Sequence, residues 1–225
     1  ALVKRDGPMP VSRALGLIDQ VGEALAYAHS QNILHRDMKP HNVMCARFHG
    51  RDHVKVLDFG LVKMVDEEGD EEHNLTTTGQ ILGTPAYMSP EQAGGDPLDA
   101  RSDLYSLGVV LYYLLAGSTP FKANSAHKLL QLAMTTEVPD VATRRQGAPI
   151  PGSLELFLRR ALAFDRKVPR GDVAAPSQRF GDLGVEAACG KERGLYGDCL
   201  HRLSGVQARV QVDRHTVSPG GFTEL

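Results

Sequence analysis

The feature that most constrains the fold is an apolar stretch from Leu107 to Ala116, which lies in a helical pattern beginning at Asp103. This stretch is about half as long as the roughly 20 residues that a membrane-spanning helix needs. A helix that is apolar on nearly all sides has to be surrounded by other elements of a folded core. The sequence therefore predicts a central, buried helix over residues 103–116.

A second, amphipathic helix is predicted over about residues 11–30. Its apolar residues are spaced three, three, four and three positions apart, which places them on one helical face. They are Leu15, Ile18, Val21, Leu25 and Ala28.

Weaker patterns complete the expected fold. Helical periodicity recurs at residues 124–134, 153–164 and 177–189. Two short apolar runs at residues 43–45 and 54–57 flank a turn at residues 47–52, and together they predict a β-hairpin. Alternation over residues 206–212 predicts one late strand. The expected fold class is therefore mainly α with a short β-hairpin.

Ser89, Pro90 and Glu91 form a helix-start signal. Serine is a favoured N-cap because its hydroxyl accepts a hydrogen bond from a free backbone N–H of the first turn. Proline is favoured at the first helical position, and an acidic side chain in the first turn complements the helix dipole. We therefore expect a helix to begin at Pro90.

The charge balance and the cysteines exclude several classes of function. With 25 basic and 27 acidic residues, the formal net charge is −2. Such a balance gives no reason to expect nucleic acid or an anionic membrane as a partner. Three scattered cysteines (Cys45, Cys189 and Cys199) are too few for a disulfide framework or a zinc site. We expect a cytoplasmic chain without a membrane segment, although the full-length protein could be anchored outside this chain.

Three motifs stand in order along the chain. They read HRDMKPHN at residues 35–42, DFG at residues 58–60 and GTPAYMSPE at residues 83–91. Together they resemble the catalytic lobe of eukaryotic-type serine/threonine protein kinases, and most closely the bacterial members. The resemblance covers about residues 11–190 and implies a kinase-like large lobe, α+β in the full domain. It also implies transfer of the γ-phosphate of ATP to serine or threonine hydroxyls of protein substrates.

The resemblance assigns the chemistry to four residues. Asp37 is expected to accept the proton of the substrate hydroxyl, and Lys39 to place a positive charge at the γ-phosphate of ATP. Asn42 and Asp58 are expected to bind Mg²⁺, which prefers hard oxygen ligands. ATP and Mg²⁺ are therefore the expected cofactors.

Two further residues are expected to border the nucleotide and the substrate. Met44 resembles the residue that forms the apolar floor under adenine, although ordinary core packing explains it nearly as well. Thr84 resembles the threonine that bonds to Asp37 and Lys39 and shapes the substrate site.

Other positions resemble structural residues of the family. His35 and Phe59 are expected in an internal apolar stack. Asp103 resembles the buried aspartate that holds the catalytic loop's backbone from the central helix. Glu91 is expected to pair with Arg179.

The resemblance also implies regulation by phosphorylation. Arg36 precedes Asp37 in the arrangement of kinases that are switched by a phosphate on the loop between DFG and SPE. Thr76 and Thr78 match the phosphorylated positions there, and Lys63 is placed to join Arg36 in binding the phosphate. The alternative is a polar loop that is never phosphorylated.

Part of the family pattern does not occur in the sequence. The 225 residues contain no GxGxxG loop and no Val-Ala-Ile-Lys strand. We therefore interpret residues 1–190 as a catalytic lobe whose N-terminal lobe is missing, and residues 191–225 as an unassigned extension or linker. Without the small lobe, Met44, Leu57 and Phe59 are expected at an open apolar surface.

Two other interpretations remain. The chain could be a non-catalytic, kinase-like module that binds partners, which the missing small lobe favours. It could also be a small-molecule phosphotransferase, although the GTPAYMSPE segment and the threonine-bearing loop before it favour a protein substrate.

Overall fold

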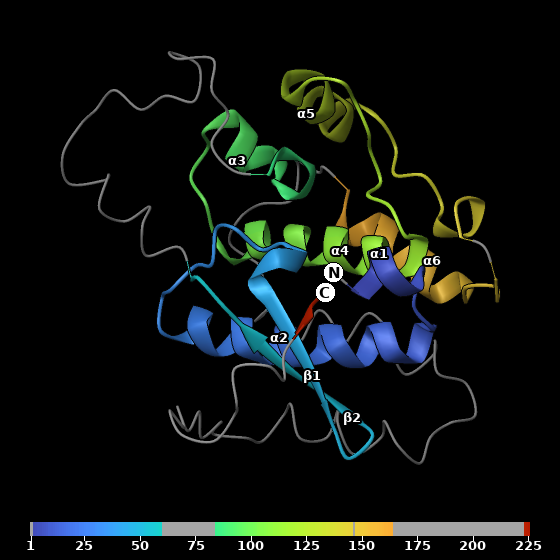
Figure 1. Cartoon of the computed structure of the whole chain (residues 1–225). Coiled ribbons are helices and arrows are strands. Elements are labelled where there is room, and N and C mark those ends of the chain that lie inside the picture. The colour runs from blue at the N-terminus through green and yellow to red at the C-terminus, as the bar shows by residue number, and fades with distance from the viewer. Residues whose placement is uncertain (1, 60–83, 146, 164–222) are drawn as a thin grey trace.

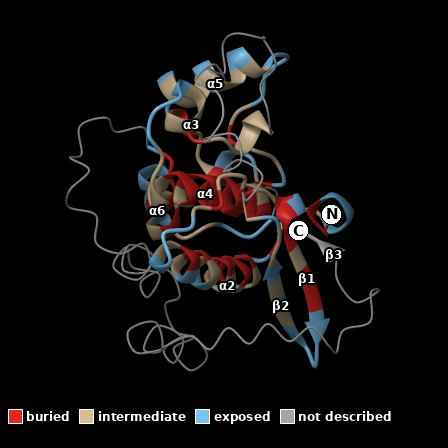
Figure 2. Cartoon of the chain, turned by 90° about the vertical axis from the view of Figure 1, so that its left-hand side faces the viewer, coloured by how far each residue is buried: buried red, intermediate tan, exposed pale blue. Residues whose placement is uncertain are grey.

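The helix predicted around the apolar stretch is α4, which spans Ala100–Ala116 in a computed structural model of the chain. The structure describes residues 2–59, 84–145, 147–163 and 223–225. Most residues of α4 are buried, and Leu107, Leu111 and Leu115 are fully so. Figure 2 shows α4 as a largely buried helix between α2 and α3. The prediction of a central buried helix is confirmed.

The remaining helices of the described residues are arranged around α4 (Figure 1). They are α1 (Leu2–Asp6), α2 (Val11–Ser30), α3 (Pro90–Gly94), α5 (Ala126–Thr135) and α6 (Gly152–Ala161), with the 3₁₀ helices η1 (Pro40–Asn42), η4 (Pro85–Tyr87) and η5 (Val141–Thr143). The bounds of α2 equal the predicted ones, and its buried face packs on α4. None of these helices is both long and apolar enough to cross a bilayer.

Helices α1 and α6 differ from the predicted helices. Helix α1 was not expected, because five residues are too few to show a period, and burial of Leu2 and Val3 stabilises it. Helix α6 ends before the predicted residue 164. The helix expected at residues 177–189 and the strand expected at residues 206–212 lie outside the described residues.

The predicted hairpin is present, but its turn is shorter than expected. Strands β1 (Val43–Phe48) and β2 (Arg51–Val56) pair antiparallel, with Val43 opposite Val56. Only His49 and Gly50 connect them, with φ of 48° and 78°. A two-residue turn with both φ values positive suits the twist of paired strands. The expectation of a turn over residues 47–52 was therefore wrong in extent.

A strand at residues 223–224 was not expected. Strand β3 (Thr223–Glu224) pairs antiparallel with the other edge of β1, which makes the sheet order β2-β1-β3. The N–H of Leu225 donates to the carbonyl of Val43 at 3.1 Å, and its side chain is fully buried. This segment belongs to the extension that sequence analysis left unassigned.

Polar contacts hold the hairpin against α2. The guanidinium of Arg13 donates two hydrogen bonds, of 2.8 and 2.9 Å, to the carboxylate of Asp52 on β2. The Gln20 amide bridges the strand backbone, donating to the Asp52 carbonyl and accepting from the N–H of Val54. The hairpin that follows Asn42 is therefore fixed, through β2, relative to the helix that precedes His35.

Helix α3 begins as predicted. The side chain of Ser89 accepts a hydrogen bond from the N–H of Gln92, and the Gln92 side chain accepts one from the N–H of Ser89. This reciprocal pair is a capping box, with Pro90 at the first helical position. The helix-start signal is confirmed.

Candidate active site

The loop between α2 and η1 brings three of the expected site residues together. The ammonium of Lys39 donates to Oδ2 of Asp37 at 2.6 Å. The side-chain amide of Asn42 donates to the main-chain carbonyl of Asp37 at 2.8 Å and to its Oδ2 at 3.3 Å. The Asp37 carboxylate is about one-third exposed. A partly exposed carboxylate and ammonium and a buried amide thus form one polar cluster.

The buried carboxylate of Asp103 holds this loop from the first turn of α4. Its Oδ2 accepts the N–H of His35 at 2.8 Å, and its Oδ1 accepts the N–H of Arg36 at 2.8 Å. Its Oδ2 also lies 2.7 Å from Nε2 of His29, at the end of α2. A buried charge is tolerated where hydrogen bonds satisfy it, and here three donors do so. The side chain of Asp103 therefore holds the backbone of the two residues directly before Asp37.

His29 contributes to this cluster through one ring nitrogen. Its Nδ1 is buried and has no hydrogen-bond partner among the described residues. A carboxylate can only accept, so Nε2 of His29 carries the proton that is donated to Asp103.

The backbone of Arg36 adopts a left-handed conformation, with φ of 63°. Such a conformation costs about 1–3 kcal/mol and persists where surrounding groups impose it. Asp103 binds the N–H of Arg36, and the Gln92 side-chain amide donates to its carbonyl at 2.7 Å. Helices α3 and α4 together therefore hold this peptide in place.

His35 links the loop to the segment that follows β2. Its Nδ1 accepts the N–H of Asp37 at 3.3 Å, so its Nε2 carries the proton that is donated to the Leu57 carbonyl at 2.9 Å. Its ring lies 4.9 Å from the Phe59 ring, measured between centroids. Burial lowers the pKa of His35, against the opposing effects of the Leu57 carbonyl and of Asp103. His35 is therefore a neutral, structural bridge.

Asp58 lies next to this bridge. The N–H of Leu57 donates to the carbonyl of Asn42 at 2.8 Å, which places the start of the DFG segment beside Asn42. Asp58 is exposed and has φ of 51°. Within the described residues its carboxylate has no hydrogen-bond or ion-pair partner, and the Asn42 amide nitrogen is turned to Asp37. Two oxygen donors are thus available nearby, which fits a hard cation such as Mg²⁺.

The buried, neutral His35 makes the stability of the chain depend on pH. Its folded-state pKa lies below its ordinary value, so at acidic pH the unfolded chain binds a proton that the folded chain does not. We expect the free energy of unfolding to fall as pH drops below about 6.5, by up to about 1.4 kcal/mol per pH unit. Urea unfolding at pH 7.5, 6.5 and 5.5 measures this slope.

Two variants separate His35 from other titrating groups. His35→Gln is expected to flatten the slope, because glutamine does not titrate. His41→Gln, at an exposed histidine six residues away, is expected to leave it unchanged. Equal slopes for the wild-type chain and His35→Gln would contradict the assignment.

Thr84 and Glu91, two other predicted site residues, form no hydrogen bond with the cluster in the described part of the chain. Thr84 precedes η4, and within the described residues it forms no hydrogen bond to Asp37 or Lys39, which bond to each other instead. Glu91 accepts a hydrogen bond from the Ser102 hydroxyl at 2.6 Å. Its expected partner, Arg179, lies outside the described residues. The same is true of three expected regulatory residues, Lys63, Thr76 and Thr78.

Met44, Leu57 and Phe59, which were expected at an open apolar surface, are half-buried. Met44 lies on β1 opposite Glu224 of β3, and Phe59 contacts the His35 ring. Strand β3, which was not expected, pairs with β1 at Met44 and Cys45.

Two positioning residues were missed by sequence reasoning. His29 directly follows Ala28, the last residue of the predicted buried face of α2. That face was predicted from apolar residues only. Gln92 follows the recognised helix-start signal, and its spacing from Ser89 is that of a capping box. Its second contact, to the Arg36 carbonyl, joins segments 56 residues apart and has no sequence signal.

Comparison with known proteins extends over most of the chain. A family model described as protein kinase domain matches residues 1–168. The serine/threonine-protein kinase pkn3 of Myxococcus xanthus is 43% identical over 163 residues, which is 72% of this chain and 30% of that protein. The serine/threonine-protein kinase PknB of Mycobacterium tuberculosis is 37% identical over 162 residues, 72% of this chain and 25% of that protein. The chain thus spans less than a third of these curated relatives.

Proposed function

We propose, because the chain belongs to the protein kinase family, that it transfers the γ-phosphate of ATP to serine or threonine hydroxyls of proteins. The observation that carries the proposal is the cluster of Asp37, Lys39 and Asn42, held by Asp103 and adjoining Asp58. Phosphate transfer depends mainly on positioning and on charge placement. The cluster supplies both.

Each residue of the cluster has one proposed task. The Asp37 carboxylate orients the substrate hydroxyl and accepts its proton. Lys39 stabilises negative charge on the transferred phosphate. The oxygens of Asn42 and Asp58 hold Mg²⁺, which neutralises phosphate charge when bound. Met44 lies on β1 as the proposed contact for adenine.

We further propose that residues 1–190 form the larger lobe of the kinase domain. Two observations support this proposal. The described helices surround α4, and the loop that carries Asp37 and Lys39 lies between α2 and η1. The printed sequence contains no GxGxxG loop and no Val-Ala-Ile-Lys strand. Because those parts of the family pattern hold the nucleotide from the other side, we expect transfer only when they are present.

Regulation and location belong to the same proposal. A phosphate on Thr76 or Thr78 would add about −1.5 to −2 charge opposite Arg36 and Lys63. Because Arg36 adjoins Asp37, such a contact would couple the loop to the site. We also propose that these residues act in the cytoplasm, where ATP and protein substrates are available.

A two-arm experiment tests this function. The 225-residue chain is assayed alone and joined to a glycine-rich loop, strand lysine and helix glutamate of the family pattern. With radiolabelled ATP, Mg²⁺ and a generic basic protein, we expect label on serine and threonine from the joined form only. Label from neither form, with both folded, would favour a non-catalytic binding module. Label on a small molecule alone would favour the small-molecule phosphotransferase.

A further inference from the structure

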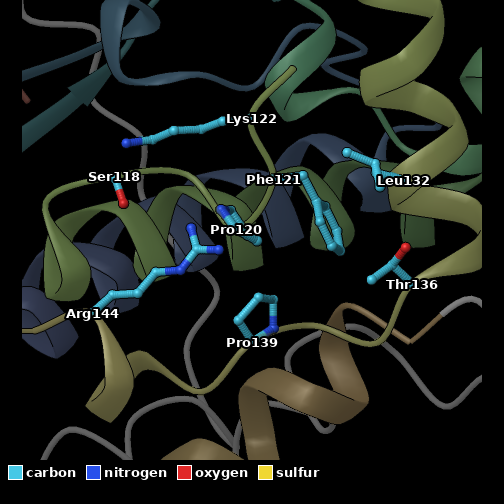
Figure 3. A pocket seen from close by; sticks show the side chains of 8 residues that line it. All are labelled: Ser118, Pro120, Phe121, Lys122, Leu132, Thr136, Pro139 and Arg144. Atoms are coloured by element: carbon cyan, nitrogen blue, oxygen red, sulfur yellow. The ribbon is translucent and has the colours of Figure 1, made fainter.

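A second concave surface lies at the opposite end of α4 from the loop that Asp103 holds. It is a cavity of about 610 Å³ between the segment after α4, helix α5 and the segment before η5 (Figure 3). Its apolar walls come from Pro120, Phe121, Leu132 and Pro139. A site of this size and lining accommodates an apolar side chain with its neighbours.

The charged side chains of the cavity are all positive. Lys122 and Arg144 line it, and none of the other described residues in the lining is acidic. Lys122 has no hydrogen-bond or ion-pair partner in the described part of the chain, and Arg144 donates only to the carbonyl of Thr119, at 3.1 Å. Figure 3 shows the Arg144 guanidinium beside Pro120 and the Lys122 ammonium above Ser118. The cavity therefore offers cations with unused donors beside an apolar floor.

The nearest acidic residues in sequence do not cancel this charge. Glu137 and Asp140 flank the lining residue Pro139, but both accept hydrogen bonds from Arg159, at 2.7–2.9 Å. Arg159, which lies outside the lining, thus offsets one of their two negative charges and holds both carboxylates by hydrogen bonds. A ligand carrying negative charge would meet Lys122 and Arg144 at the lining itself.

Helix α5 also has unburied apolar surface here. None of its residues is buried, although its sequence is amphipathic. Leu132 of this helix faces the cavity. An amphipathic helix that is only half covered by its own chain is typical of an interaction surface.

We propose that this cavity, which we term the basic pocket, docks a segment of the protein substrate in which an acidic residue adjoins a large apolar one. The apolar side chain would lie on Phe121 and Pro120, and the carboxylate would bind Arg144 and Lys122. The proposal rests on the proposed function for the identity of its partner. Docking of such a segment explains why cations and apolar walls occur together in the basic pocket.

The length of α4 sets a spacing rule for such substrates. Asp103 and Ala116 lie 13 residues apart on this helix, which at 1.5 Å per residue is about 20 Å. An extended chain covers about 3.3 Å per residue. The docking residues are therefore expected at least about six residues from the phosphorylated serine or threonine.

Peptide binding tests the pocket without requiring catalysis. Fluorescein-labelled nonapeptides carry a central phenylalanine flanked by aspartates, by serines or by lysines, and anisotropy is read with the 225-residue chain. We expect the aspartate peptide to bind at least tenfold more tightly than the serine peptide, and its affinity to fall with added salt. The lysine peptide is expected not to bind. Equal binding of the aspartate and lysine peptides overturns the proposal.

Matched variants locate the binding. Both pocket cations are exposed, so the double variant Lys122→Glu/Arg144→Glu is expected to fold and to lose at least tenfold in affinity for the aspartate peptide. Lys128→Glu, at an exposed residue of α5 outside the lining, is the control and is expected to bind normally. If the double variant folds by circular dichroism and binds as the wild type does, the basic pocket is not the site.

Catalysis then tests the spacing. The joined form used above is given substrates with the acidic–apolar pair two, six or ten residues from the phosphorylated serine. We expect a lower KM for the six- and ten-residue spacings only, and loss of that advantage in the double variant. A two-residue spacing that performs as well contradicts docking at this place. Failure of the proposed function is a different result, because anisotropy would still report peptide binding.

Discussion

Replacing Asp37 with asparagine is expected to lower phosphate transfer by a factor of about 10²–10⁴, the usual contribution of a general base. Asparagine has nearly the same shape, and its oxygen can still accept the hydrogen bond from Lys39. It cannot take up the proton of a hydroxyl, and it removes the negative charge beside the Lys39 ammonium, now 2.6 Å from Asp37. The loss is therefore expected in the rate of transfer and not in the fold.

Single-turnover assays of the joined form, at saturating ATP and Mg²⁺, measure this loss. Thermal unfolding is expected to be nearly unchanged, because the Asp37 side chain is partly exposed. His41→Gln in η1 changes an exposed neighbour with no proposed role and is expected to transfer phosphate at the wild-type rate. Undiminished transfer by Asp37→Asn would remove Asp37 from the proposed mechanism.

Helices with strong periodicity were predictable from the sequence, and elements that depend on distant partners were not. Helix α2 shows its buried face in its own spacing, and α4 shows its burial in its composition. Strand β3 is too short to have a pattern, and it exists because Leu225 is buried and β1 has a free edge. The turn at His49 and Gly50 was placed too broadly because the strands extend through polar residues.

Among the residues of the candidate site, too, some could be predicted from the sequence and others could not. Asp37, Lys39 and Asn42 could be selected from one motif because their contacts span at most five residues. Gln92 and His29 reach the loop from other helices, so their contacts appear only in three dimensions. The basic pocket is formed by three segments whose residues have no common motif. The resemblance therefore indicated the cluster and one support, Asp103, but not the supports Gln92 and His29.

Those supports predict the largest loss of stability. Asp103→Ala leaves the N–H groups of His35 and Arg36 and the Nε2–H of His29 without their acceptor in a buried place. Each unpaired buried donor costs about 1–3 kcal/mol. We expect the free energy of unfolding to fall by about 3–5 kcal/mol, as when one partner of a buried charged group is removed. Urea unfolding at pH 7.5 measures it.

A matched control comes from the residue that caps the same helix. Asp99 accepts a hydrogen bond from the N–H of Arg101 at 2.8 Å, and Asp99→Ala is expected to cost about 1 kcal/mol, as loss of an N-cap does. Hydrogen exchange separates the two effects further. Asp103→Ala should accelerate exchange at the amides of His35 and Arg36 more than within α4, whereas Asp99→Ala should affect only the start of the helix. If both variants lose the same stability and exchange alike, Asp103 acts as an ordinary residue of the first turn of α4. The loop between α2 and η1 is then held by other contacts.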